Sequence, residues 1–257
     1  MNATELLTAY YTIVRKEVVR FTRIWMQTLL PPVITQSLYF LIFGAFIGSQ
    51  VGDINGVSYM AFIVPGLVMM AVISNSYNNV VSSFFSTKFQ KSIEEILVSP
   101  TPNWVVIAGY TSGGAIRGLT VGLLVFLVSF IFVMPEIYSI WIILLFIVFT
   151  AVLFALGGLI NAIFGRTFDD LSIFLTFVLT PLIYLGGVFY SINNLPEFWQ
   201  GVSRFNPILY MVNGFRYGFY GFSDVSVVVS VIVLIGFTIL LAGFALLLMK
   251  KGIGLRK

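Results

Sequence analysis

Polar side chains that could line a path for a solute are concentrated in one stretch, SNSYNNVVSS, at residues 74–83. On a helix, Asn75, Asn79 and Ser82 fall on one face, and Asn78 lies beside it. Amide and hydroxyl groups in an apolar segment need hydrogen-bonding partners. This face is therefore expected either to line a cavity or to hold two helices together, and the residues alone leave both interpretations open.

The residue types needed for catalysis, metal binding or a proton relay are absent or poorly placed. The chain has no cysteine and no histidine, which excludes thiolate sites and removes the commonest general base. It has no G-x-x-x-x-G-K-[ST] motif, so we do not expect it to bind ATP through a P-loop. None of its ten Asp and Glu residues falls in the middle of a predicted span. We therefore predict that the chain is not an enzyme, holds no metal or cofactor, and takes the energy for any transport from elsewhere.

The elements that must position these residues are transmembrane helices. The 257 residues are 59% hydrophobic and 9% charged, whereas soluble domains carry about 25% charged residues. Six apolar segments each reach the roughly 20 residues that cross a bilayer. The predicted spans are 25–47, 59–85, 104–133, 140–164, 171–190 and 227–249. The sequence thus predicts an all-α integral membrane protein, with residues 1–257 forming one transmembrane domain.

Most of the basic residues gather on one side of these spans. They are Arg15, Lys16, Arg20, Arg23, Lys88, Lys91, Arg166, Lys250, Lys251, Arg256 and Lys257. The positive-inside rule then places both termini and the loop after the second span in the cytoplasm. Residues 5–24 are amphipathic and are expected to form a helix in the membrane interface, although a plain basic flank of the first span is the alternative.

The loop 88–99 is the only charged segment between spans that is long enough to form a cytoplasmic helix. Lys88, Lys91, Glu94 and Glu95 supply its charges, and the second and fourth of these are four residues apart, as in a helical ion pair. A short exposed helix of this kind could dock into a groove on a soluble partner. An ordinary solvated loop is the alternative.

Small residues recur along the third span. Gly114, Gly118 and Gly122 repeat every four residues, and Gly109 with Gly113 does the same one face over. Glycines at this spacing allow helix backbones to approach closely. Both rows are expected to pack against neighbouring helices.

Arg117 is the one ionisable residue well inside a predicted span. If the third span begins in the cytoplasm, this side chain lies near enough to the interface to extend its charge into it. Pairing with Asp169 or Asp170, on the same side, is the alternative.

The segment 195–222 is too aromatic for a solvated loop and too short to cross the bilayer and return. A short helix is expected to start at Pro196, and Pro207 is expected to break it before a second helix that carries Tyr210 and Arg216. Together they would form a re-entrant hairpin on the outer side of the membrane, with backbone covered by protein or water.

Arg216 is a basic residue on the side where the positive-inside rule does not predict one. We expect it to hold the second hairpin helix by bonding carbonyl groups at a neighbouring helix end, or an acidic group such as Glu197 or Asp224. The alternative is that it attracts an anionic head group of a substrate.

The same region carries a resemblance to a known family. The residues that fit its spaced signature are Leu179, Leu182, Leu185-Gly186, Val188, Leu195-Pro196, Pro207-Ile208, Tyr210 and Arg216. In this pattern and in its layout of spans, the chain resembles the ABC-2 type transporter permeases over nearly its whole length. The FDD at 168–170 and the TPLIYLGGVFY at 180–190 are similar to the bacterial subgroup near the nodulation-factor and polysaccharide exporters.

The resemblance implies half of an ABC exporter. Two permease chains, expected to be identical, would pair with two separately encoded ATPase chains that bind ATP and Mg. The loop 88–99 would be the coupling helix, resting in a groove of the ATPase together with the N-terminal helix. Spans two and five would line the cavity between the permease chains, so Tyr184 joins the candidates for substrate contact, and the hairpin 195–222 would be the outer gate.

The implied location is the bacterial inner membrane, with lipid and the ATPase as partners and no nucleic acid. Two other functions remain open from the residues themselves. An ATP-independent secondary transporter or channel would move solute on its own. A membrane scaffold would bind other envelope proteins and move nothing.

Overall fold

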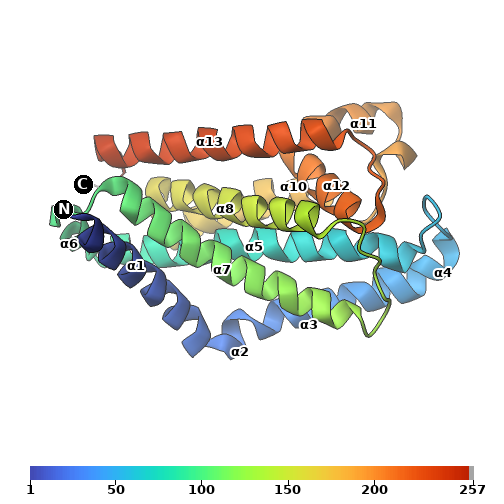
Figure 1. Cartoon of the computed structure of the whole chain (residues 1–257), viewed down its shortest axis with the longest axis horizontal. Helices are drawn as coiled ribbons and strands as arrows, with labels where there is room; N and C mark the ends of the chain where they lie inside the picture. The colour runs from blue at the N-terminus through green and yellow to red at the C-terminus, as the bar shows by residue number, and fades with distance from the viewer. Residues whose placement is uncertain (255–257) are drawn as a thin grey trace.

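The computed structural model describes residues 1–254, apart from the side chains of Ser49 and Leu97. Within that part the chain is an elongated bundle of helices, as Figure 1 shows, and the predicted all-α class is confirmed. Arg256 and Lys257, which we predicted to lie on the cytoplasmic side, are outside the described residues.

Within residues 1–254, five helical segments are long and apolar enough to cross a membrane, and they match five of the six predicted spans. They are Trp25–Ile47, Tyr59–Phe89, Asn103–Ser129, Ile140–Phe164 and Val227–Lys251. The last four are α5, α7, α8 and α13 in Figure 1. The third span ends four residues earlier than predicted, because residues 130–133 leave the helix in turns.

The first span is a composite of short helices. It consists of α2 (Trp25–Thr28), α3 (Leu30–Tyr39) and the π-helix η1 (Phe40–Ile47), and the short helix α4 (Gly48–Val51) follows it. Pro31 and Pro32 stand in the first turn of α3, where a missing N–H costs no hydrogen bond. The proline pair therefore marks the start of this helix.

The predicted fifth span, 171–190, is shorter in the structure. It runs through α9 (Phe168–Phe174), the π-helix η2 (Leu175–Leu179) and α10 (Thr180–Tyr184) and then turns. The turn contains Gly187 at a φ of +74°, a conformation that favours glycine. Beyond it the backbone of Val188 lies so close to Gly66 that any Cβ at Gly66 would collide with it. Residues 185–190 are thus a packed turn and not the outer end of a helix.

The N-terminal helix α1 (Ala3–Arg23) lies against α7, and the glycines of α7 explain how. A Cβ at Gly109 or Gly113 would meet Ile13 or Glu17 of α1. The other three glycines of α7 face α5, where a Cβ would meet side chains or carbonyl oxygens of Val72, Ser76 and Val80. The two predicted glycine rows therefore serve two different helix contacts, and their packing role is confirmed.

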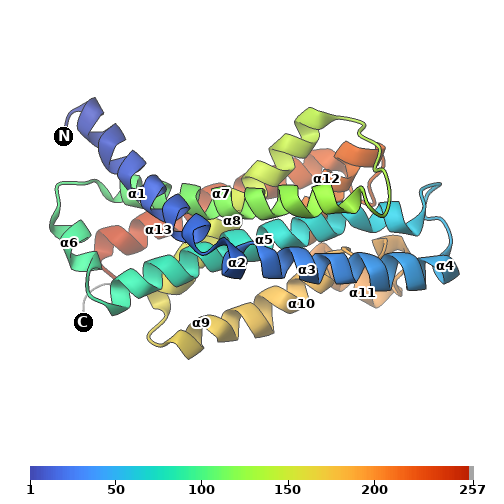
Figure 2. The same cartoon turned by 90° about the horizontal axis from the view of Figure 1, so that it is seen from below.

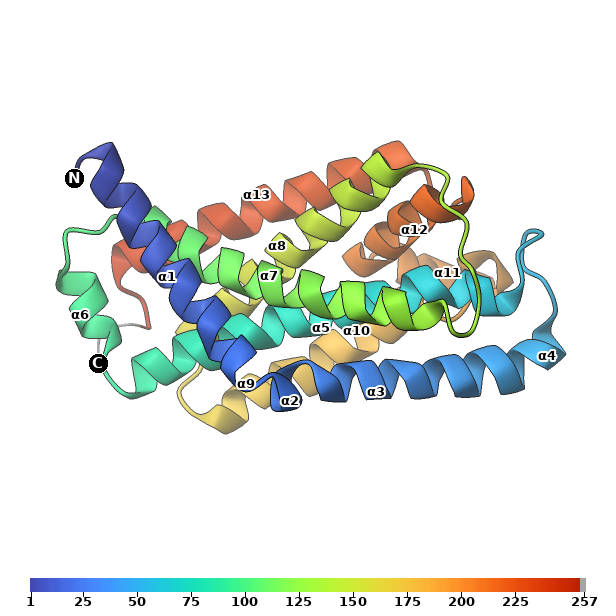
Figure 3. The ribbon, with the colours of Figure 1, turned by 60° about the horizontal axis from the view of Figure 1, so that its bottom comes forward.

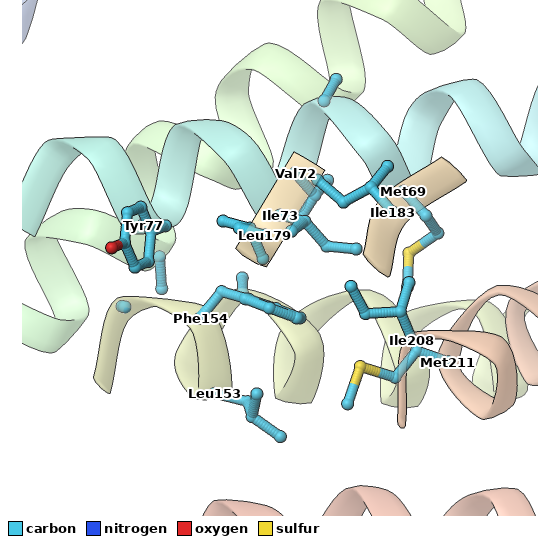
Figure 4. Packing of buried hydrophobic residues seen from close by; sticks show 14 of the residues in the cluster. Met69, Val72, Ile73, Tyr77, Leu153, Phe154, Leu179, Ile183, Ile208 and Met211 are labelled. Carbon is cyan, nitrogen blue, oxygen red and sulfur yellow. The ribbon is translucent and has the colours of Figure 1, made fainter. Parts of the chain in front are cut away.

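Helix α5 forms the centre of the bundle, between α7 and α8. In the most apolar stretch of 18 residues, 83% of the residues of α5 are buried, compared with 17% for α13, which lies on the outside of the bundle. Figure 4 shows Met69 and Ile73 of α5 near Leu179, Ile183 and Phe154, so that α9–α10 reaches the central helix through side chains.

The two ends of the bundle are different. The N-terminus, the last turn of α13 and the short helix α6 (Ile93–Val98) lie at one end, as Figures 1 and 2 show. The other end carries the 3-10 turn η3 (Ile192–Asn194), α11 (Glu197–Arg204) and α12 (Pro207–Tyr220). The two predicted hairpin helices are therefore present, with the break between them just before Pro207.

Candidate functional site

Helix α5 carries two rows of polar side chains on different faces. The first row is buried and the second is partly exposed. The buried row is Asn75, Asn79, Ser83 and Thr87. The accessible row is Ser74, Asn78, Ser82 and Ser86. The predicted face of Asn75, Asn79 and Ser82 therefore combined members of both rows.

Two members of the buried row, Asn79 and Ser83, bond side chains of α1. Glu17 is fully buried, and its carboxylate accepts hydrogen bonds from the Ser83 hydroxyl and from Asn79 Nδ2, the latter at 3.4 Å. Arg20 lies 3.2 Å from the same carboxylate and donates to Asn79 Oδ1 at 2.8 Å. A buried carboxylate is tolerated only when it is paired and hydrogen-bonded, and here both conditions hold. We call Glu17, Arg20, Asn79 and Ser83 the α1–α5 joint.

This arrangement of α1 was not predicted from the sequence. Arg20, one of the basic residues of the expected interfacial helix, turns inward to α5 because Glu17 is buried one turn away. Glu17 itself was not singled out in the sequence. The signal that could have found it is Gly113, which is small because Glu17 lies against it.

Arg117 does not pair with Asp169 or Asp170. Its guanidinium donates to the carbonyl of Thr28 at 3.2 Å and to Asn75 Oδ1 at 3.4 Å. Asn75 in turn donates to the carbonyl of Ala71 at 2.9 Å. Both polar groups are thus used to join α7, α5 and the start of the first span.

The accessible row is less covered by the rest of the chain, and among residues 1–254 its one contact with α1 is a bond of 3.5 Å from Arg20 to the Ser82 hydroxyl. Figures 2 and 3 show that α3 and α9–α10 are neighbours of α5. Ser82 is exposed and Asn78 is half-buried, so both could reach a molecule outside this chain. Contact with a substrate stays a prediction for all the candidates on α5, and exposure favours Asn78 and Ser82 over Asn75 and Asn79.

Aromatic side chains join the two flanking spans. The hydroxyl of Tyr39 on α3 lies 3.1 Å from that of Tyr184 at the end of α10. Phe189 stacks on Tyr184 with ring centres 5.9 Å apart and contacts Phe43 at 4.5 Å. The backbone carbonyl of Phe189 accepts a bond from Tyr59, at the start of α5, so the cluster lies toward the hairpin end. Tyr184 is 39% exposed and remains accessible from one side.

The predicted coupling helix 88–99 is shorter than expected. Lys88 belongs to the last turn of α5, which continues to Phe89. The chain then turns at Lys91, whose φ is +60°, before α6 begins at Ile93. Because this turn separates them, Lys91 and Glu95 do not form the predicted ion pair along one helix.

Lys88 is directed into the protein. Its ammonium donates to the carbonyls of Ile163 at 2.6 Å and Gly165 at 2.7 Å, at the carboxyl end of α8. Carbonyls at that end of a helix carry partial negative charge, so a cation is favourable there. Lys88 thus ties the start of the loop to α8, and direct contact with another protein stays a prediction.

Helix α6 presents its charged side outward. Ile93 is buried against the bundle, whereas Glu94, Glu95 and Lys91 are exposed. Val98 at the far end is 85% exposed. Ile96 also packs against the core. A short helix anchored on one side, with acidic and apolar groups exposed on the other, has the form of a docking element.

The hairpin is held by Arg216, which is fully buried. Its guanidinium donates to the carbonyl of Gly187 at 2.7 Å and lies over the ring of Phe62, 3.9 Å from its centre. The predicted bond to a carbonyl near a helix end is therefore present. The carboxylate of Asp224 bonds Ser191 and residue 192 instead, and neither it nor Glu197 forms an ion pair with Arg216.

The other hairpin candidates shape the two helices. Pro196 is the N-cap of α11, and Pro207 is the first residue of α12. The Asn206 side chain accepts a bond from the backbone of residue 208 and donates to the carbonyl of Leu182, at 2.6 Å. Tyr210 donates to the carbonyl of residue 204 at 2.8 Å, which closes the angle between the helices.

The model of the ABC-2 type transporter family matches residues 8–220, which include the α1–α5 joint, α6 and the hairpin. The chain belongs to this family. Among curated proteins, this ABC-2 chain is 57% identical over 241 residues to the inner membrane transport permease YadH of Escherichia coli strain K12, covering 94% of each chain. It is 24% identical over 203 residues to nodulation protein J of Rhizobium meliloti, covering 79% of this chain and 78% of that protein.

Membership in the ABC-2 family makes this chain a membrane transport subunit, as the sequence indicated. Among residues 1–254, no three acidic side chains lie close enough to share a metal ion. The polar chemistry of this ABC-2 chain is instead arranged along α5, with one row holding the protein together and the other left accessible.

Proposed function

We propose that this chain is the membrane subunit of an ATP-driven exporter and works as a pair of identical chains with two ATPase subunits. The ATPase chains bind ATP and Mg. Helix α6 is the docking element, and its outward face of Glu94, Glu95 and Val98 is the observation that supports this assignment most directly. The export direction rests on the resemblance to the ABC-2 exporters, and the name of the Escherichia coli relative, an inner membrane transport permease, supports the inner-membrane location.

The substrate path in this proposal follows the accessible row of α5. Its four members supply three hydroxyls and one amide, without a formal charge. Such groups can donate and accept hydrogen bonds, so they suit a substrate rich in hydroxyl or amide groups. The cluster of Tyr39, Tyr184 and Phe189 closes the row toward the hairpin end and is the part of the path that must open.

Docking at α6 is tested by co-purification of this chain with its ATPase subunit. Charge reversal in Lys91→Glu with Glu95→Lys should abolish co-purification, because it reverses charges that α6 and the turn before it present to the ATPase. Both side chains are exposed, so the fold of the bundle should not change. Glu136→Lys, exposed in the loop between α7 and α8, is the matched control. Figure 1 shows this loop at the end of the bundle opposite α6. Retained binding by the double variant would show that α6 is not the docking element.

The two alternatives make different predictions. A secondary transporter or channel would give solute flux in proteoliposomes that contain this chain alone. A scaffold would bind partners without changing any ATPase rate. The proposal requires that the purified ATPase hydrolyse ATP at a different rate when this chain is bound, and that the chain alone support no flux.

A further inference from the structure

A groove lies between α7 and α13 at the end of the bundle that carries the N-terminus and the last turn of α13. It has a volume of about 460 Å³ and is lined by Asn103, Trp104, Gly243, Leu246, Leu247 and Lys250. The lining is apolar along α13, where both leucines are partly exposed. Its polar side chains, Asn103 and Lys250, lie at the start of α7 and in the last turn of α13, and we call this end the mouth of the groove. A groove of this form in a membrane protein faces lipid and must be filled by something apolar.

The mouth of the groove is basic. Lys250 and Lys251 stand exposed in the last turn of α13, and no hydrogen bond or ion pair within residues 1–254 involves either ammonium group. The backbone N–H groups of Asn103 and Trp104, at the start of α7, have no acceptor in the same part of the chain. No acidic side chain lines the groove. An anionic group at this mouth would therefore meet several donors and no repulsion.

The floor of the groove is open because of a glycine. A Cβ at Gly243 would have no atom within 4 Å, unlike the glycines of α7, which are small because another helix touches them. Packing within this chain therefore does not explain Gly243. Its absent side chain leaves room for a chain of methylene groups alongside Leu246 and Leu247.

We propose that this groove binds one anionic phospholipid, with the phosphate at Lys250 and the start of α7 and an acyl chain along Gly243. Trp104 is 53% exposed and stands where an indole ring prefers to sit, between head groups and hydrocarbon. A lysine near an anionic membrane surface contributes about 1 kcal/mol, which corresponds to a preference of about fivefold for the anionic lipid. The proposal does not depend on the ATPase or on the transported substrate.

The test uses Trp104 as a reporter in the purified full-length chain. Trp25, Trp141 and Trp199 are replaced by phenylalanine, and the protein is reconstituted with phosphatidylglycerol or phosphatidylcholine brominated on the acyl chains. Bromine quenches tryptophan on contact. We expect brominated phosphatidylglycerol to quench Trp104 about five times more effectively at equal mole fraction. A chain that keeps only Trp141, exposed at the start of α8 near the opposite end, is the control and should show no preference.

Two substitutions separate the head-group contact from the acyl-chain contact. Lys250→Gln should remove most of the preference, whereas Lys250→Arg should keep it. Gly243→Leu should reduce quenching by both lipids because it fills the floor, and it should fold normally since its Cβ meets nothing within 4 Å.

Equal quenching by the two lipids, or a preference that survives in Lys250→Gln, would overturn the proposal. Unchanged quenching in Gly243→Leu would exclude an acyl chain in the groove. Absence of quenching by either lipid would mean that protein, either a second copy or a partner, covers the groove instead.

Discussion

Replacing Glu17 with glutamine should loosen α1 from the bundle without changing its shape. Glu17 is fully buried and Arg20 is 31% exposed at the side chain, with 3.2 Å between them. Glutamine can still accept one hydrogen bond, but Arg20 then keeps a positive charge against Asn79 without a counter-charge. Breaking a buried pair by removing one partner costs 3–5 kcal/mol, and because Arg20 is partly exposed we expect about 3 kcal/mol.

Trypsin measures this change directly, because α1 contains Arg15, Lys16, Arg20 and Arg23. Cleavage within a helix requires it to open, and when opening is fast the rate follows the population of the open form. A loss of about 3 kcal/mol raises that population about 100-fold, at tenfold per 1.4 kcal/mol. Cleavage of α1 in Glu17→Gln should therefore be about 100-fold faster than in the unchanged chain.

Glu5→Gln is the matched control, because Glu5 lies on the same helix and is exposed. It should change the rate of cleavage by less than about threefold, as expected for a surface charge. In the double variant Glu17→Gln with Arg20→Gln, cleavage at Arg23 should be slower than in Glu17→Gln alone, since the charge without a counter-charge has been removed. The reasoning about the α1–α5 joint is refuted if Glu17→Gln is cleaved no faster than Glu5→Gln.

Three further substitutions test other contacts. Arg216→Lys should lower the thermal unfolding midpoint in detergent by the equivalent of about 2 kcal/mol. Lysine cannot both reach the Gly187 carbonyl and lie flat on the ring of Phe62. An unchanged midpoint would contradict the structural role of Arg216. Lys88→Met should speed hydrogen exchange at the carboxyl end of α8 by about tenfold, because it loses charged hydrogen bonds that contribute about 1.5 kcal/mol or more. Lys88→Arg should keep the protection of these amides. Gly118→Leu should prevent folding, because its Cβ would collide with a side chain and a carbonyl of α5. The measurement is loss of the monodisperse peak on size exclusion. Gly157→Leu, with open space around its Cβ, should give a normal peak.

The sequence was sufficient to predict the class of fold and most of the long helices. Long apolar runs, proline pairs and glycine spacing have local physical causes, so the five long helices, the start of α3 and the break before Pro207 could be predicted. The family could also be recognised, because its signature depends on residue identities along the chain.

The pairing of polar side chains could not be predicted in the same way. Helical periodicity shows which residues share a face but not which helix covers that face. Asn79 and Ser82 are three residues apart and were placed together, yet Asn79 is covered by α1 and Ser82 is exposed. Glu17 was not singled out from the sequence, because its burial depends on a contact with residues more than sixty positions away.

The end of the fifth span was predicted wrongly for a different reason. Its sequence is apolar through Tyr190, but residues 185–190 turn because Gly187 adopts a positive φ and Val188 packs on Gly66. The tertiary contact outweighed the hydropathy pattern. A window of hydropathy cannot detect a contact of this kind.

The two rows on α5 differ in how freely they can vary during evolution. A substitution in the buried row disturbs α1 or Arg117 and therefore the fold, whereas the accessible row has small side chains with free space on one side. Relatives could exchange Ser74, Asn78, Ser82 and Ser86 at little cost in stability while the frame around them stays fixed. A chain built in this way can acquire a new cargo through a few neutral changes on a single helix face, and libraries randomised at these four positions should retain a high proportion of folded protein.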